Sequence, residues 1–184
     1  MAKAYIFLAD GFEEVEALTV VDLLRRAGIE IPMISISKSL EVTGAHQIRV
    51  MADGLFDDTS FDDADLLVLP GGLLGTNNLM DHEGLDKLLM EFNKKKKNIA
   101  AICAAPSILG SKGLLAGKQS TCYPGFEDRL TDSIVVNEDV VEDGNVVTSK
   151  GLGTAIDFSL ALIKKLMGKD VSKKIAKDII YKHY

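Results

Sequence analysis

One cysteine stands at a position that suits nucleophilic chemistry. Cys103 directly follows the apolar run 99–102, and Pro106 comes three residues later. Proline is favoured in the first turn of a helix and keeps the residue before it out of the α region, so we expect the chain to turn sharply from a strand into a helix at Cys103. Such a nucleophile elbow presents its side chain above the sheet, and the helix N-terminus favours a thiolate. A buried structural cysteine is the alternative.

A carboxyl group near the start of the chain is the expected partner of this thiol. Glu13, Glu14 and Glu16 open a predicted helix. Acidic side chains in a first turn usually complement the helix dipole, and we assign that role to Glu13 and Glu14. Glu16 lies beside the apolar face of Val15 and Leu18, so an inward-facing carboxyl there would be desolvated and its pKa raised. Protonated Glu16 could donate a hydrogen bond to the thiolate and pass a proton to a substrate.

Two glycines follow another predicted strand. Gly71 and Gly72 come after the apolar run 65–69 and Pro70. Glycine lets the backbone approach a ligand closely, and an amide from this turn could form an oxyanion hole with the amide of Ala104. A plain turn from strand to loop is the alternative for the glycines alone.

The elements that must position these residues alternate along the chain. We expect strands over 3–9, 30–37, 65–69 and 98–102, helices over 14–27, 83–97, 106–112, 154–167 and 171–181, and hairpins over 42–50 and 134–149. This alternation predicts one α/β domain spanning 1–184, a flavodoxin-like three-layer α/β/α sandwich around a mainly parallel sheet. Ligands in such folds bind at the carboxyl ends of the strands, which is where the cysteine and the glycines fall.

Composition and charge exclude several classes of function. The chain has 184 residues and a formal net charge of −6, so it lacks the basic surface of a nucleic-acid binder. We interpret the run Lys94–Lys97 as a solvated helix end. No apolar stretch is long enough to cross a membrane or to form a signal-peptide core. Two cysteines and three scattered histidines show no zinc spacing. We therefore expect a cytoplasmic protein with reduced cysteines and no metal.

Several motifs in a fixed order carry a resemblance to a known family. They are residues 11–16 (GFEEVE), Asp22 with 25–28 (RRAG), 69–72 (LPGG) with 74–75 (LG) and 78–79 (NL), 100–106 (AAICAAP), and 148–151 (TSKG) with 153–154 (GT). Over nearly its whole length the chain resembles the DJ/ThiJ/PfpI superfamily, and within it the branch of the Parkinson-associated protein deglycase and its bacterial relatives.

The resemblance implies roles for particular residues. Cys103 would be the family's reactive, oxidation-prone nucleophile, and Glu16 its protonated partner. Gly72 and Ala104 would supply the oxyanion-hole amides. The substrate pocket would include His46, Arg26, Gly71 and Ala105. The resemblance also implies a homodimer with the first helix near the interface, a small carbonyl substrate and no cofactor.

The chain departs from the family pattern at three positions. Tyr123 stands where the family often has a histidine, and we include it among the candidate catalytic residues although its hydroxyl is a poor base near neutral pH. His46 stands where several relatives have an arginine, and Ala105 where glycine is common. These changes concern the choice of substrate rather than the cysteine.

Two functions remain after the alternatives are weighed. Ala104 occupies the place of the histidine of protease-like relatives, no late histidine suits an amidotransferase, and the acidic loop 10–13 would repel a flavin phosphate. The first remaining function is cofactor-free conversion of 2-oxoaldehydes such as methylglyoxal to 2-hydroxy acids, or deglycation of their early adducts. The second is an oxidative-stress sensor or redox-regulated chaperone that acts through oxidation of Cys103. The sequence does not separate the two, because both use the same residues.

Overall fold

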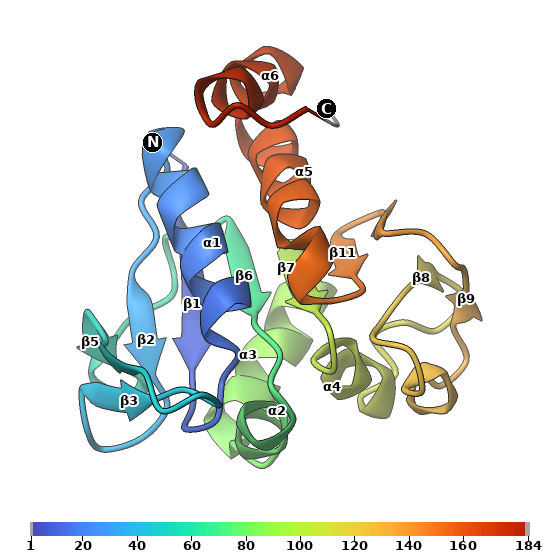
Figure 1. The fold of residues 1–184 in the computed structure, drawn as a ribbon. Helices are drawn as coiled ribbons and strands as arrows, with labels where there is room; N and C mark the ends of the chain where they lie inside the picture. The colour runs from blue at the N-terminus through green and yellow to red at the C-terminus, as the bar shows by residue number, and fades with distance from the viewer. Residues whose placement is uncertain (1, 183–184) are drawn as a thin grey trace.

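A seven-stranded sheet forms the centre of the molecule in the computed structural model, which describes residues 2–182 (Figure 1). Its strands, in spatial order, are β10 (Val140–Asp143), β11 (Val146–Ser149), β7 (Asn98–Ile102), β6 (Leu66–Leu69), β1 (Ala4–Leu8), β2 (Met33–Ser35) and β5 (Gly54–Leu55). All neighbouring pairs are parallel except β10 with β11. The predicted mainly parallel sheet is confirmed.

Helices cover both faces of this sheet. One face carries α1 (Glu14–Arg26), α5 (Ala155–Met167) and α6 (Lys169–Asp178), and the other carries α2 (Leu73–Met80), α3 (Glu83–Lys94) and α4 (Pro106–Ser111) (Figure 1). The side chains of strand β1 explain why the molecule has two hydrophobic cores, one on each face of the sheet. The alternate residues Ile6 and Leu8 of this strand pack with α1 and α5, whereas Tyr5 and Phe7 pack with α3 and α4. Because a strand directs successive side chains to opposite faces, an apolar strand buried on both sides requires helices on both.

Smaller elements lie at the margins of the sheet. They are the antiparallel pair β3 (Glu41–Thr43) and β4 (Arg49–Met51), the parallel pair β8 (Gln119–Ser120) and β9 (Ile134–Val135), and 3-10 turns at Phe56–Asp58, Glu127–Arg129 and Leu152–Thr154. The hairpin predicted over 42–50 is therefore confirmed.

The hairpin predicted over 134–149 is correct only in its second half. Strands β10 and β11 pair around Gly144, which has a φ of +58°, as the Asp-Gly turn predicts. Strand β9 instead pairs with β8, a short strand that the sequence analysis missed. Helix α2 was also missed, because its glycine and asparagines weaken the helical pattern.

The order of the strands brings three chain segments to one edge. Strands β1, β6 and β7 are neighbours and parallel, so their carboxyl ends lie side by side. The segments that follow these ends are the loop 10–13, the glycines 71–72 and the cysteine at 103. Among the described residues no helix is long and apolar enough to cross a membrane.

Close contact between backbones holds this edge together. The N–H of Gly75 at the start of α2 donates to the carbonyl of Gly11 at 3.1 Å. A Cβ at Gly75 would lie 2.7 Å from the Cα of Phe12. Gly72 has a φ of +86°, and a Cβ there would lie 2.3 Å from the carbonyl oxygen of Gly11. Glycine at both positions is thus required for α2 to approach the first loop.

Replacing Gly75 tests this constraint. We expect Gly75→Ala to lower the free energy of unfolding by about 1–3 kcal/mol, because the added methyl group would push two backbones apart. Urea unfolding followed by circular dichroism measures the change. Gly153→Ala is the matched control, since a Cβ there meets no atom within 4 Å. Equal unfolding midpoints for the two variants would contradict the argument.

Candidate active site

Cys103 sits in the predicted elbow between β7 and α4. Its φ is +65°, in the left-handed region that non-glycine residues rarely adopt. Its N–H donates to the carbonyl of Ser149 at 2.9 Å, and its carbonyl accepts from the N–H of Tyr123 at 2.8 Å. Pro106 stands in the first turn of α4, as expected. The two flanking hydrogen bonds hold a backbone conformation that would otherwise cost roughly 1–3 kcal/mol.

Glu16 faces this cysteine from the first turn of α1. Its side chain is buried, its Oε2 accepts from the N–H of Gly71 at 2.9 Å, and its carboxyl group shares a hydrogen bond with the Cys103 thiol. Burial raises the pKa of Glu16 to about 7, which outweighs the lowering by the bonds from Cys103 and Gly71. The negative charge of Glu13 adds a smaller rise. The inward orientation and raised pKa predicted for Glu16 are thus confirmed.

The thiol is less acidic than its place beside a helix predicts. Burial raises the pKa of Cys103 to about 12, and the charge of Glu16 and the hydrogen bond to it add to the rise. Backbone N–H groups of Gly72 and Ala104 bond the sulfur and lower the pKa. The expectation of a free thiolate therefore needs correction. Two buried acids side by side hold one proton between them, and the pair carries a single negative charge above the first ionisation.

Two glycines make room for this pair. A Cβ at Gly71 would lie 2.5 Å from both the Cys103 Cβ and the Glu16 Oε2, so any larger residue would separate thiol from carboxyl. A Cβ at Gly151 would lie 3.8 Å from the Cys103 Sγ and from the Glu16 Oε1. The sequence analysis missed Gly151 as a site residue. Its place after β11, the neighbour of β7, is the signal that could have found it.

Tyr123 lies at the rim of the site. Its side chain is half exposed, and its ring packs edge-on against Phe126 at a centroid distance of 6.4 Å. The Cδ2 of Tyr123 would be 3.3 Å from a Cβ on Gly151, the residue that also borders the sulfur. The structure thus brings Tyr123 to the edge of the thiol–carboxyl pair.

His46, which the resemblance places in the substrate pocket, binds the carboxylate of Glu14 instead of facing the thiol. It lies in the turn between β3 and β4, where its Nδ1 is 2.8 Å from the Oε2 of Glu14 and 3.8 Å from the Oε1 of Glu13. Burial raises the pKa of Glu14, but hydrogen bonds from the His46 side chain and from backbone groups outweigh it, so the pKa lies below its usual value. The dipole role assigned to Glu14 is therefore incomplete, because this buried carboxylate anchors the turn.

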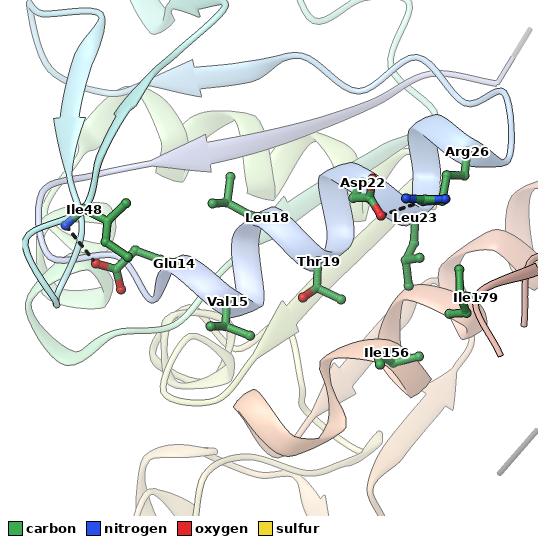
Figure 2. A pocket seen from close by; sticks show the side chains of 10 residues that line it. All are labelled: Glu14, Val15, Leu18, Thr19, Asp22, Leu23, Arg26, Ile48, Ile156 and Ile179. Atoms are coloured by element: carbon green, nitrogen blue, oxygen red, sulfur yellow. Dashed lines mark hydrogen bonds and ion pairs between the residues drawn. The ribbon is translucent and has the colours of Figure 1, made fainter. Parts of the chain in front are cut away.

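Two residues expected in the substrate pocket lie elsewhere. Arg26 is at the far end of α1, ten residues and about 15 Å along the helix from Glu16, and its Nε binds the Oδ2 of Asp22 at 2.7 Å (Figure 2). Ala105 is fully buried in the core between the sheet and α4. Within this chain the Arg26 side chain does not reach the thiol–carboxyl pair, and Ala105 is a core residue rather than part of an open pocket.

The second cysteine is buried away from solvent. Cys122 is 4% exposed, and burial raises the pKa of its thiol to about 11. Both Cys103 and Cys122 are free thiols. The reactive arrangement of glutamate, glycines and helix start belongs to Cys103 alone.

An apolar groove runs along the outer side of α1. Figure 2 shows Val15, Leu18 and Ile156 along this groove, which has a volume of about 660 Å³. It is lined by Glu14, Val15, Leu18, Thr19, Asp22, Leu23, Arg26, Ile48, Ile156 and Ile179. The sulfur of Cys103 does not border it. The groove is therefore a surface separate from the thiol–carboxyl pair.

Comparison with known proteins agrees with this fold and site. The model of the DJ-1/PfpI family matches residues 2–165. The chain is 36% identical over 180 residues to protein dj-1beta of Drosophila melanogaster, covering 97% of this chain and 96% of that one. It is 32% identical over 166 residues to a deglycase of Pyrococcus abyssi, covering 89% and 99%. It spans only 39% of the length of protein DJ-1 homolog B of Arabidopsis thaliana, to which it is 36% identical over 171 residues.

Solved structures give the same result. The oxidized DJ-1 of Toxoplasma gondii superposes with a TM-score of 0.96 at 34% identity, over the full length of both chains. DJ-1beta of Drosophila melanogaster superposes with a TM-score of 0.95 at 34% identity, over 99% of each chain. Because the family model matches residues 2–165 and the fold and site agree with it, the chain belongs to the DJ-1/PfpI family.

Proposed function

We propose that this chain is a cofactor-free enzyme that converts small 2-oxoaldehydes such as methylglyoxal to 2-hydroxy acids, or removes their early adducts from amines. The observation that carries the proposal is the placement of the buried Glu16 carboxyl group against the Cys103 thiol, beside the amides of Gly72 and Ala104 that bond the sulfur. A nucleophile, a proton carrier and two donors for a developing oxyanion are the parts that carbonyl addition requires. The deglycase relative from Pyrococcus abyssi supports it.

The reaction follows from these positions. The Cys103 sulfur attacks the aldehyde carbon, and the carbonyl oxygen takes the proton held by Glu16, giving a hemithioacetal. The amides of Gly72 and Ala104 stabilise negative charge on that oxygen. Glu16 then removes the hydrogen from the former aldehyde carbon and returns a proton to the adjacent carbon, while the hydroxyl proton of the hemithioacetal moves to the neighbouring ketone oxygen, which yields a 2-hydroxy thioester. Water cleaves the C–S bond, releases the 2-hydroxy acid and restores the thiol. On an amine adduct, the same attack would expel the amine.

The second candidate function uses the sulfur itself. The oxidized state named for the Toxoplasma gondii relative favours a sensor or redox-regulated chaperone in which oxidation of Cys103 is the functional event. The same amides and the Glu16 carboxyl would bind the added oxygens. Two free cysteines suit a reducing compartment, and we propose the cytoplasm as the location.

Turnover of methylglyoxal tests the enzyme proposal. We expect Cys103→Ala to abolish lactate formation and Glu16→Gln to lower the rate by about 10²–10⁴-fold, because the amide cannot carry the proton. Loss of the dicarbonyl and appearance of lactate are measured together. Cys122→Ala, which removes the other thiol, is expected to retain the activity. A wild-type rate no greater than that of Cys103→Ala would reject the dicarbonyl reaction and leave the sensor as the leading function.

The pH dependence of thiol reactivity tests the shared proton. The pair loses its first proton near pH 7 and keeps the second to about pH 12, and between these values the fraction present as thiolate with a protonated carboxyl group is constant. In Cys122→Ala protein, we expect the alkylation rate by iodoacetamide to rise around pH 7 and then stay level. Adding Glu16→Gln should remove this first titration and leave a simple thiol curve. Identical profiles with and without Glu16 would contradict the pairing.

We also propose that the apolar groove along α1 binds a second copy of this chain. Val15 and Ile48 line it and are 47% and 53% exposed, so a charge there should oppose association. We expect Val15→Asp to sediment as a monomer and wild type as a dimer in analytical ultracentrifugation. Met90→Asp is the matched control, because Met90 is 50% exposed on α3 at the opposite face. Dimers of equal stability in both variants would reject the groove as the interface.

A further inference from the structure

Three side chains of metal-binding type meet outside the thiol–carboxyl pair. The carboxylates of Glu13 and Glu14, at the start of α1, lie against the imidazole of His46 in the β3–β4 turn. One atom from each of the three lies within 4.8 Å of the others. Among residues 2–182, this is the one group of three or more histidine, cysteine or acidic side chains that comes together in this way.

An ion pair between His46 and Glu14 does not account for the whole cluster. Glu13 also approaches the imidazole, at 3.8 Å, and its side chain is only 14% exposed. No described residue donates a hydrogen bond to the Glu13 carboxylate. Two carboxylates thus meet one imidazole in a partly buried place, which leaves an excess negative charge even when the imidazole is protonated. When the imidazole is neutral, as it must be to bind a metal, two negative charges face it, and a divalent cation would balance both.

The groups around the cluster hold Glu14 in the orientation of a metal ligand. Its Oε1 accepts from the backbone N–H of His46 at 2.7 Å, while its Oε2 faces the His46 Nδ1 at 2.8 Å. Gly44 lets the turn close on this carboxylate, since a Cβ there would lie 2.2 Å from the Oε1. One oxygen therefore holds the turn, and the other is hydrogen-bonded to the imidazole, so a bound metal would replace the proton between Oε2 and Nδ1. Ligating carboxylates are typically hydrogen-bonded in this manner.

We propose that Glu13, Glu14 and His46 form a binding site for a divalent transition-metal ion of the zinc type. Imidazole nitrogen with carboxylate oxygens suits zinc, whereas magnesium and calcium prefer oxygen ligands alone. Bonds of about 2.0–2.2 Å in a tetrahedral site place neighbouring ligand atoms roughly 3.3–3.5 Å apart. The observed separations from His46 Nδ1, 2.8 Å and 3.8 Å, lie on either side of that value. Water would take the fourth position.

The site escapes a search for zinc spacing in the sequence. Glu14 and His46 are separated by 32 residues, and the cluster contains a single histidine and no cysteine. Bound metal would connect the β3–β4 turn to the start of α1. The site does not depend on the chemistry of Cys103, so it can be tested without that residue.

Zinc binding to the full chain carrying Cys103→Ala tests the proposal, because this change removes the thiol as a competing ligand. Isothermal titration with zinc chloride should show one ion per chain. His46→Ala and Glu13→Gln, each added to this parent, should weaken binding by more than the roughly 10–100-fold that loss of an outer-shell partner costs. His82→Ala, which removes a histidine at the start of α3, should bind like the parent.

Two further measurements separate a metal site from a structural ion pair. Zinc should raise the melting temperature of the parent and leave that of Glu13→Gln nearly unchanged, and Glu13 makes no described side-chain hydrogen bond whose loss would unfold the chain. Circular dichroism checks that His46→Ala, which keeps its backbone N–H, remains folded. Parent-like zinc affinity in both His46→Ala and Glu13→Gln, or no saturable binding by the parent, would overturn the proposal.

Discussion

The proton shared by Cys103 and Glu16 is the interaction on which the arrangement of the site depends. Burial raises the pKa of Glu16 to about 7, and burial together with the charge of Glu16 and the hydrogen bond to it raises the pKa of the thiol to about 12. The contact is possible only because Gly71 has no Cβ and because Cys103 accepts a left-handed backbone. The strained backbone of Cys103 thus lowers the local stability but keeps the thiol and the Glu16 carboxyl group close enough to share a proton.

The order of the strands places the segments that hold the strained backbone of Cys103 on either side of it. Strand β7 lies between β6 and β11, so the elbow is flanked by the glycine turn 71–72 on one side and by Gly151 on the other. The backbone bond from Cys103 to Ser149 ties the elbow to β11. Helix α1 covers one face of the sheet, and its first turn places the Glu16 side chain next to Cys103 at the end of β7. A change in the order of these three strands would separate the thiol from its partners.

The sequence predicted the site better than its surroundings. Apolar runs that end in Gly, Pro or Cys mark β6 and β7 reliably. The burial of Glu16 was predicted from a face through Val15 and Leu18. These two residues instead line the outer groove, and the buried face of α1 runs through Ala17, Val20 and Leu24. The parallel pairing of β8 with β9 was not predictable in that way, since strands of two residues carry no periodicity. The family resemblance names Arg26 for the pocket, but its place ten residues after Glu16 on α1 puts it about 15 Å along the helix from that residue.

Glu14 and Glu16 show that burial alone does not set the acidity of a carboxyl group. Both side chains are almost fully buried, at 2% and 1% exposure, yet the pKa of Glu14 is lowered and that of Glu16 is raised. Two positions along a helix turn a side chain by about 200°, so the carboxyl groups face opposite sides of α1. Glu14 meets the His46 imidazole and backbone amides, which favour the carboxylate. The Glu16 carboxyl group accepts a hydrogen bond from one amide and lies against the Cys103 thiol, which is itself an acid. Glu16 also lies deeper in the protein than Glu14, which is next to the exposed His46, so depth and the donors that each carboxyl group meets together decide which glutamate keeps its proton near neutral pH.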